Sequence, residues 1–173
     1  MKVTDIGTPS KKLNDFWTAR AEARRSRESW TQEHAPRVRE QLYAIAKAVN
    51  DNAKLDHEGQ RLEVVMSGER NPVVLVRVGG GPTGMRTEAN AAVSETGAEL
   101  RYEVTTSGTV VVEAWASSLS RDDERTITRL ANMPPQDLNH DVVQDHLKDF
   151  LAFAQQHDWA GNAHRIPEQI EAE

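Results

Sequence analysis

Apolar residues between Leu62 and Ser117 recur mostly at every second position, and this alternation limits the possible folds more than any other feature of the chain. Period-2 alternation is typical of β-strands with one apolar and one polar face. On either side of this stretch, apolar residues recur at three- and four-residue spacing, as in amphipathic helices. The chain is therefore predicted to be α+β, with a sheet over residues 60–118 between helices over 11–53 and 121–158.

Two helices are predicted before the sheet. The first begins near Ser10, a suitable N-cap, and runs through about Glu33. Pro36 marks a break and fits the first turn of the second helix. The apolar stripe of the first helix is thin and consists of Phe16, Ala19, Ala23 and Trp30. The second helix has a stronger apolar face, made of Val38, Leu42, Ile45, Ala46 and Val49.

The sheet is predicted to be an antiparallel meander of about five strands. The strands are expected at residues 62–66, 73–78, 85–94, 100–106 and 109–117. If the loop Ser107-Gly108 has two residues, Leu100 faces Trp115 and Val104 faces Val111. A loop of another length would move these side chains to the opposite face, because the strand period is two residues.

Two further helices are predicted to pack on one face of this sheet. The first starts at Asp122-Asp123-Glu124, where acidic residues favour a helix N-terminus, and ends at Pro134-Pro135. Its apolar face would be Ile127, Leu130 and Ala131. The second starts at Asn139 or His140 and buries Val143, Leu147, Phe150, Leu151 and Ala154. Residues 10–161 would form one domain, between a short tail at 1–9 and an acidic tail at 162–173.

Composition excludes several classes of protein. The 173 residues are 38% hydrophobic and 28% charged, and no apolar run approaches the roughly 18 residues of a membrane helix. Cysteine is absent, which excludes disulfides and thiolate chemistry. No signal-peptide pattern opens the chain, so we expect a cytoplasmic protein without membrane contact.

A glycine run after the second predicted strand suggests a nucleotide site. Gly79, Gly81 and Gly84 fit the G-x-G-x-x-G pattern, and Val-Gly-Gly-Gly-Pro-Thr-Gly resembles the phosphate turn of flavoprotein Rossmann domains. Glu103 lies near the position of a ribose-binding carboxylate. However, residues 85–94 alternate as a strand rather than a helix, and no second βαβ unit follows. A plain loop between strands is favoured, and a small flavin- or nucleotide-binding protein remains the alternative.

Charge is unevenly distributed along the chain. Residues 1–48 contain ten Lys/Arg and six Asp/Glu, whereas residues 119–173 contain five and eleven. The first helix has a basic stripe of Arg20, Arg24 and Arg27 with Arg25 nearby, and the last has an acidic stripe of Asp141, Asp145 and Asp149. Glutamates interleave with the arginines, so nucleic-acid binding is a third hypothesis and attraction between these two helices is favoured.

The first helix is the best candidate for a binding surface. Trp17 and Trp30 accompany its arginines, and tryptophan and arginine are enriched at protein interfaces. We therefore predict a non-enzymatic adaptor, chaperone-like or accessory protein that binds a protein partner or itself. The predicted contact residues are Trp17, Arg20, Arg24, Arg27 and Trp30. The sequence nominates no catalytic residue, metal site or cofactor.

Overall fold

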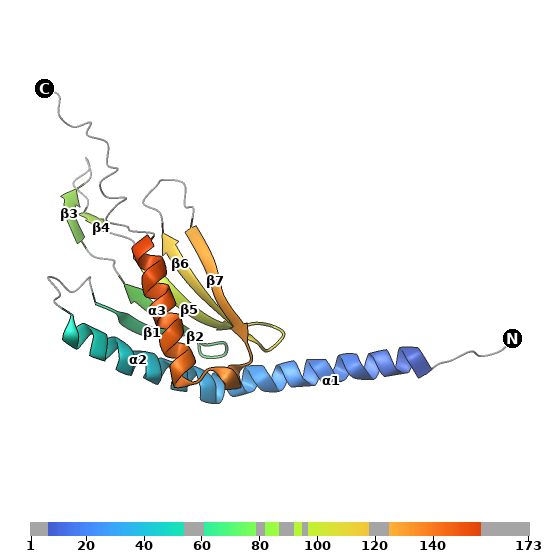
Figure 1. The fold of residues 1–173 in the computed structure, drawn as a ribbon. Helices are drawn as coiled ribbons and strands as arrows, with labels where there is room; N and C mark the ends of the chain where they lie inside the picture. Colours follow the sequence, from blue (N-terminus) through green and yellow to red (C-terminus); the bar gives the residue numbers. More distant parts are fainter. Residues whose placement is uncertain are drawn as a thin grey trace, which may run out of the picture.

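The computed structural model describes residues 7–53, 61–78, 82–86, 92–94, 97–117 and 125–156 of the chain. A five-stranded antiparallel sheet forms one layer, and helices α2 (Ala35–Asn52) and α3 (His140–Gln156) form a second layer on one of its faces (Figure 1). Helix α1 (Gly7–Ser29) projects from this body as a single rod. The α+β class and the antiparallel sheet predicted from the sequence are confirmed. The predicted acidic tail at 162–173 lies outside the described residues, as do residues 1–6 of the predicted tail at 1–9; α1 begins at Gly7, within that tail and before the expected N-cap at Ser10.

Helices α1 and α2 are joined without a loop. A π-helical turn, η1 (Trp30–His34), connects them, and the Ala35 amide donates to the Trp30 carbonyl across it. Pro36 follows in the first turn of α2. A proline ring clashes with the carbonyl four residues earlier in a regular α-helix, and the wider π turn relieves that clash. The predicted break at Pro36 is therefore a bend in a continuous helix.

The sheet has the strand order β1-β2-β5-β6-β7, and all neighbouring pairs are antiparallel. Its strands are β1 (Glu63–Ser67), β2 (Val73–Val78), β5 (Ala98–Val104), β6 (Val110–Ser117) and β7 (Arg125–Met133). Strands β3 (Pro82–Arg86) and β4 (Ala92–Ser94) form a separate antiparallel pair. The prediction of a single strand over residues 85–94 is therefore wrong for the described residues. Residues 85–86 belong to β3, and residues 92–94 belong to β4.

The β5–β6 loop is one residue longer than the two-residue loop considered from the sequence. The Gly108 amide donates to the Thr105 carbonyl at 3.0 Å, and the Thr105 amide donates to the Thr109 carbonyl at 2.8 Å. Gly108 has a φ of 86°, as the last position of a three-residue hairpin loop requires. Leu100 consequently faces Ala114, and Trp115 moves to the opposite face of the sheet.

Residues 125–133 form strand β7 and not the predicted helix. The β6–β7 register shifts between Val112, which faces Ala131, and Glu113, which faces Arg129. This bulge leaves Leu130 as an extra residue, so Leu130 and Ala131 both pack against the core. The bulge also explains the error, because it produces a helix-like spacing of apolar residues within a strand. One C-terminal helix, α3, is therefore present among the described residues.

The core lies between the sheet and the two helices that cover it. Val38, Leu42 and Ala46 of α2 are buried as predicted, whereas Val49 is exposed at the end of the helix. The inward face of α3 is also confirmed, with Val143, Leu147 and Phe150 buried. From the sheet, the core includes Val74, Val76, Leu100, Tyr102, Val112 and Ala114.

Candidate protein-docking helix

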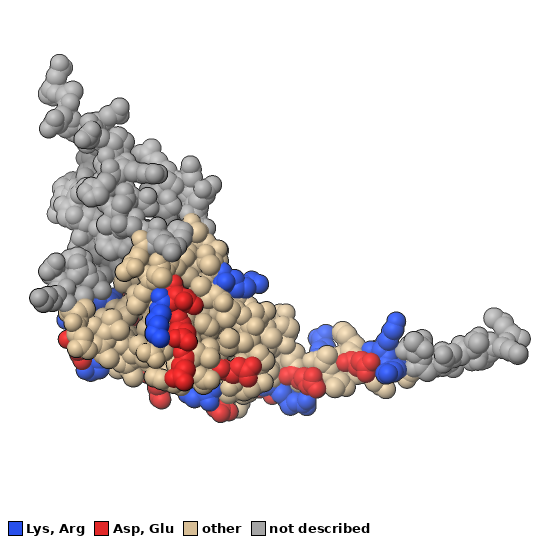
Figure 2. All heavy atoms as spheres, in the orientation of Figure 1, with Lys and Arg blue, Asp and Glu red and all other residues tan. Residues whose placement is uncertain are grey.

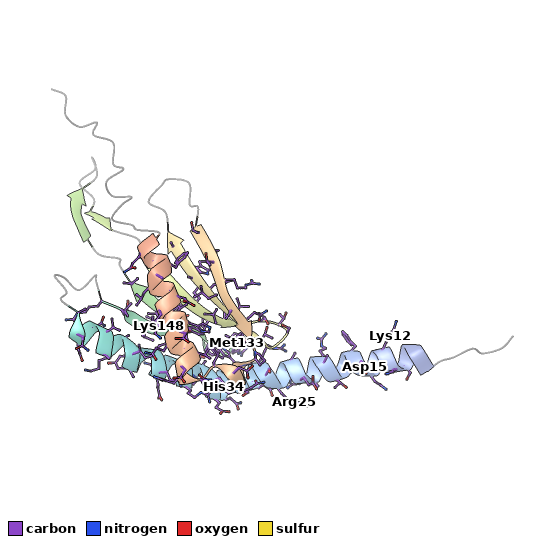
Figure 3. All side chains as sticks on the ribbon, in the orientation of Figure 1. Lys12, Asp15, Arg25, His34, Met133 and Lys148 are labelled. Carbon is purple, nitrogen blue, oxygen red and sulfur yellow. The ribbon has the colours of Figure 1, made fainter. Side chains whose placement is uncertain are left out.

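The first half of α1 has no neighbour among the described residues. Every side chain from Ser10 to Glu22 is exposed, and Figure 3 shows Lys12 and Asp15 extending from the helix into open space. Helices in globular proteins obtain most of their stability from packing an apolar face. A helix that extends unpacked from a folded body is therefore a candidate binding element.

Large apolar side chains are exposed on this projecting segment. Leu13, Phe16 and Trp17 are 55%, 52% and 57% exposed. Their spacing of three and four residues places them on one side of the helix, where the rings of Phe16 and Trp17 meet edge to face at 5.3 Å. At 100° per residue, Arg20 and Arg24 continue the same stripe toward the body. We call Leu13, Phe16, Trp17, Arg20 and Arg24 the docking face.

The base of α1 is held by the β5–β6 hairpin. The Arg27 guanidinium donates to the Thr106 carbonyl, and a Cβ at Gly108 would lie only 2.8 Å from the Ser26 Cβ and 2.9 Å from the Ala23 carbonyl oxygen. The absence of a side chain at Gly108 thus permits close contact between the loop and the helix. These contacts fix the direction in which the docking face projects.

Trp30 anchors the helical rod to the core. Its side chain is fully buried, and its indole N–H donates to the Pro72 carbonyl at 2.8 Å. The hydroxyl of Thr31, the next residue, can donate its one proton to the Arg27 carbonyl at 3.0 Å or to the Arg70 carbonyl at 3.3 Å. Pro72 and Arg70 lie in the β1–β2 turn region, so the Trp30 hydrogen bond ties the helix junction to that turn.

A buried histidine completes the junction. The His34 Nδ1 lies 2.9 Å from the Arg37 guanidinium, which also donates to the Leu138 carbonyl at 3.3 Å. Burial lowers the pKa of His34, the Arg37 charge lowers it further, and Glu33 partly opposes this shift. Neutral His34 can accept the hydrogen bond from Arg37, and protonation would remove that acceptor.

The structure separates the predicted contact residues into two groups. Trp17, Arg20 and Arg24 lie on the projecting helix, whereas Arg27 and Trp30 contact the body. Leu13 and Phe16 join the first group although they were not predicted as contact residues. The spacing of Leu13 from Phe16 and Trp17 indicates that the three side chains share one side of the helix. Spacing alone does not show that all three are exposed.

The expected attraction between the basic first helix and the acidic last helix does not occur within one chain. Arg24 pairs with Glu28 of its own helix at 2.9 Å, and Asp145 pairs with Lys148 of its own helix at 2.9 Å. Figure 3 shows Arg25 on α1 well away from Lys148 on α3. The hydrogen bond between Lys148 and Asp145, and then the attraction of their charges, raises the pKa of Lys148 and lowers that of Asp145.

The predicted nucleotide-turn residues are only partly described. Gly79 and Gly81 lie outside the described residues. Gly84 belongs to strand β3, at a place where a Rossmann turn would open a helix, and β2 pairs antiparallel with β5. Glu103 is exposed on β5 and accepts from Arg101 at 3.3 Å. The described geometry therefore differs from that of a dinucleotide-binding unit.

The face of the sheet opposite α2 and α3 carries paired charges. Arg101 lies 4.4 Å from the ring centroid of Trp115, and Glu113 accepts from the Trp115 indole and from Arg129, each at 3.1 Å. A shallow depression of about 200 Å³ lies between Arg101, Glu113 and Arg129. Its lining includes two arginines and two glutamates, so its formal charges balance.

A second buried histidine lies between α3 and the sheet. His146 Nδ1 is 3.3 Å from the Tyr102 hydroxyl. Burial lowers the pKa of His146, with Asp149 and Asp145 opposing it, and burial raises the pKa of the Tyr102 phenol. Among the described residues, no group of three or more His, Asp and Glu side chains is placed to hold a metal ion.

No helix in the described part of the chain combines the length and apolar content needed to cross a bilayer. Comparison with protein-family models, curated proteins and solved structures finds no match to this chain.

Proposed function

We propose that this chain is a non-enzymatic adaptor, chaperone-like or accessory protein of the cytoplasm that binds a protein partner or itself through α1. The observation that carries the proposal is the docking face, where three large apolar side chains are each more than half exposed on a projecting helix. Burying one such side chain fully contributes about 1.5–3 kcal/mol. Because each of the three is 52–57% exposed, a partner that covers them would gain about half of this amount per side chain.

The composition of the docking face favours recognition of another protein. An amphipathic helix commonly binds by inserting apolar anchors at i, i+3 and i+4 into a groove. Tryptophan and arginine are the residue types most often found to dominate binding energy at interfaces. Leu13, Phe16 and Trp17 supply the anchors, and Arg20 and Arg24 supply the charges beside them.

Binding of nucleic acid through the same helix has less support. Arg27 is engaged with the Thr106 carbonyl, and Arg25 lies about 100° around the helix from Arg24. The remaining arginines, Arg20 and Arg24, accompany large apolar side chains rather than forming a wide basic surface. Under this proposal, retention on heparin should be weak and should change little in an Arg20→Glu/Arg24→Glu variant.

The experiment compares two double variants of α1 in extracts of cells that express the full chain. Leu13→Ala/Trp17→Ala removes the anchors, and Thr18→Ala/Glu22→Ala changes two exposed residues on the opposite side. Blue-native gels should show the wild type and the Thr18/Glu22 variant in the same assembly, which the Leu13/Trp17 variant should lose. Equal migration of all three proteins would contradict the proposal.

A further inference from the structure

We infer that the docking face of α1 binds α3 of a second copy of this chain. The inference rests on the proposed function, because it assigns a partner to the same docking face. Its basis is a match in charge and spacing between two exposed surfaces that cannot meet within one molecule.

The two helices carry opposite charge. Residues 10–29 of α1 contain six Lys/Arg and three Asp/Glu, whereas residues 140–156 of α3 contain three Asp and one Lys. The acidic residues of α3, Asp141, Asp145 and Asp149, are all exposed on its outer side. Figure 2 shows an acidic column where α3 lies in Figure 1, with basic atoms beside it.

The spacing of the charges also matches. Arg20 and Arg24 are four residues apart on α1, and Asp141 and Asp145 are four residues apart on α3. Four residues span about 6 Å along a helix, so two such pairs can form at once when the helices lie side by side. The side chains are free to reorient, because Arg24 and Asp145 are 76% and 69% exposed.

An antiparallel arrangement also gives Trp17 and Leu13 a neighbour on α3, whereas Phe16 lies opposite the exposed Asp149 carboxylate. With Arg24 opposite Asp141 and Arg20 opposite Asp145, Trp17 lies opposite Lys148 and Leu13 opposite Ala152. The lysine can cover the indole ring with its apolar stem and place its ammonium over the ring face. Ala152 is exposed and small, which leaves space for Leu13. This order also places the two helix dipoles in the favourable antiparallel direction.

Each copy has one docking face and one acidic column, so two copies can make the contact twice. A dimer in which each α1 lies on the partner's α3 would satisfy both surfaces of both molecules. The ion pairs involved are exposed and individually weak, so the association should weaken as the salt concentration rises.

Charge reversal tests this inference with the purified full chain. One variant carries Arg20→Glu and Arg24→Glu, and the other carries Asp141→Lys and Asp145→Lys. Sedimentation velocity should show wild-type dimers at low salt and at least a tenfold weaker association for each variant alone. An equimolar mixture should recover the wild-type association, because both contacts of the mixed dimer then join opposite charges. Circular dichroism confirms that each variant is folded.

Several outcomes would overturn the inference. They are a wild-type chain that stays monomeric at low salt, a dimer that neither variant weakens, and a mixture that associates no better than its components. The proposed function is tested separately by the Leu13→Ala/Trp17→Ala comparison in cell extract. If that variant loses the wild-type assembly while the dimer inference fails, α1 binds a different protein.

The register can be tested because the chain contains no cysteine. A Leu13→Cys/Ala152→Cys variant should form disulfide-linked dimers under mild oxidation. The matched control, Glu22→Cys/Ala152→Cys, places the first thiol on the opposite side of α1 and should remain largely monomeric. Equal crosslinking of the two variants would overturn the antiparallel arrangement.

Discussion

Trp17 and Trp30 lie on one continuous helical rod but have opposite surroundings. Trp17 is 57% exposed on the docking face, whereas Trp30 is fully buried and bonded to the Pro72 carbonyl. The same residue type thus has two roles, one at a surface available for binding and one in the core. Replacing each residue by alanine separates these roles.

We expect Trp30→Ala to lower the free energy of unfolding by about 3–5 kcal/mol, because it leaves a large cavity and an unpaired buried carbonyl. In protein dilute enough to be monomeric, Trp17→Ala should change it by less than about 0.5 kcal/mol, since the side chain is then mostly in solvent. Urea unfolding followed by circular dichroism measures both values. Similar losses in the two variants would mean that the projecting helix packs on the body in solution.

Gly108 should tolerate no side chain. Alanine there must adopt a φ near 86° and would press its Cβ against Ala23 and Ser26 of α1. We expect Gly108→Ala to destabilise the protein by about 1–3 kcal/mol in thermal or urea unfolding. Ser107→Ala in the same loop is the control and should have a much smaller effect. Unchanged stability of Gly108→Ala would show that the loop does not contact α1 closely.

His34 and His146 should make stability depend on pH. Burial lowers the pKa of both residues, so the unfolded chain binds more protons than the folded chain when the pH falls below the ordinary histidine value of about 6.5. Their contribution to stability is therefore complete above that pH and is lost as the pH falls through the lowered values. Urea unfolding should show lower stability at pH 5.5 than at pH 7.5.

The His146→Gln variant should show a smaller difference between the two pH values. His140→Gln removes an exposed imidazole from the same helix and serves as the matched control, with the wild-type difference retained. If the stability of His146→Gln changes between the two pH values by as much as that of the wild type, His146 does not cause the pH dependence.

Among the elements, α1 differs most from the others. Residues 10–22 of α1 are all exposed and pack against no other described element, and the Arg24–Glu28 ion pair lies beyond them, nearer the body. We expect amides of residues 10–22 to exchange hydrogen much faster than those in the buried parts of α2 and α3. They should become protected at concentrations where the chain associates. Strong protection in dilute protein would contradict the exposed state of α1.

The sequence predicts those elements best whose apolar pattern is continuous. The inward faces of α2 and α3 were found because Val38, Leu42, Val143 and Leu147 repeat at helical spacing. Strand β7 was not predicted, because its bulge at Leu130 interrupts the alternation of apolar residues. The β-branched residues Thr126, Ile127 and Thr128 did favour a strand there. The face of β6 depended on one residue of loop length, which local sequence does not fix.

For the whole molecule, the arrangement of α1 relative to the body could not be predicted. The sequence indicates a helix with aromatic and basic residues, and it equally allows that helix to pack on the sheet. Tertiary contacts at Gly108, Trp30 and His34 determine its direction. These contacts join residues far apart in the sequence, and no local sequence pattern predicts them. The sequence therefore predicts the helix, and of the five predicted contact residues the structure places Trp17, Arg20 and Arg24 on the projecting segment and Arg27 and Trp30 against the body.

Site-specific photocrosslinking at residue 17 tests the central claim most directly. Benzoylphenylalanine in place of Trp17 should give discrete crosslinked products in cells that express the chain, either with a second copy or with another protein. The same group in place of Glu22, on the opposite side of α1, should give few. If the two positions give the same products, or if neither gives any, the docking face does not bind a protein and the account is wrong.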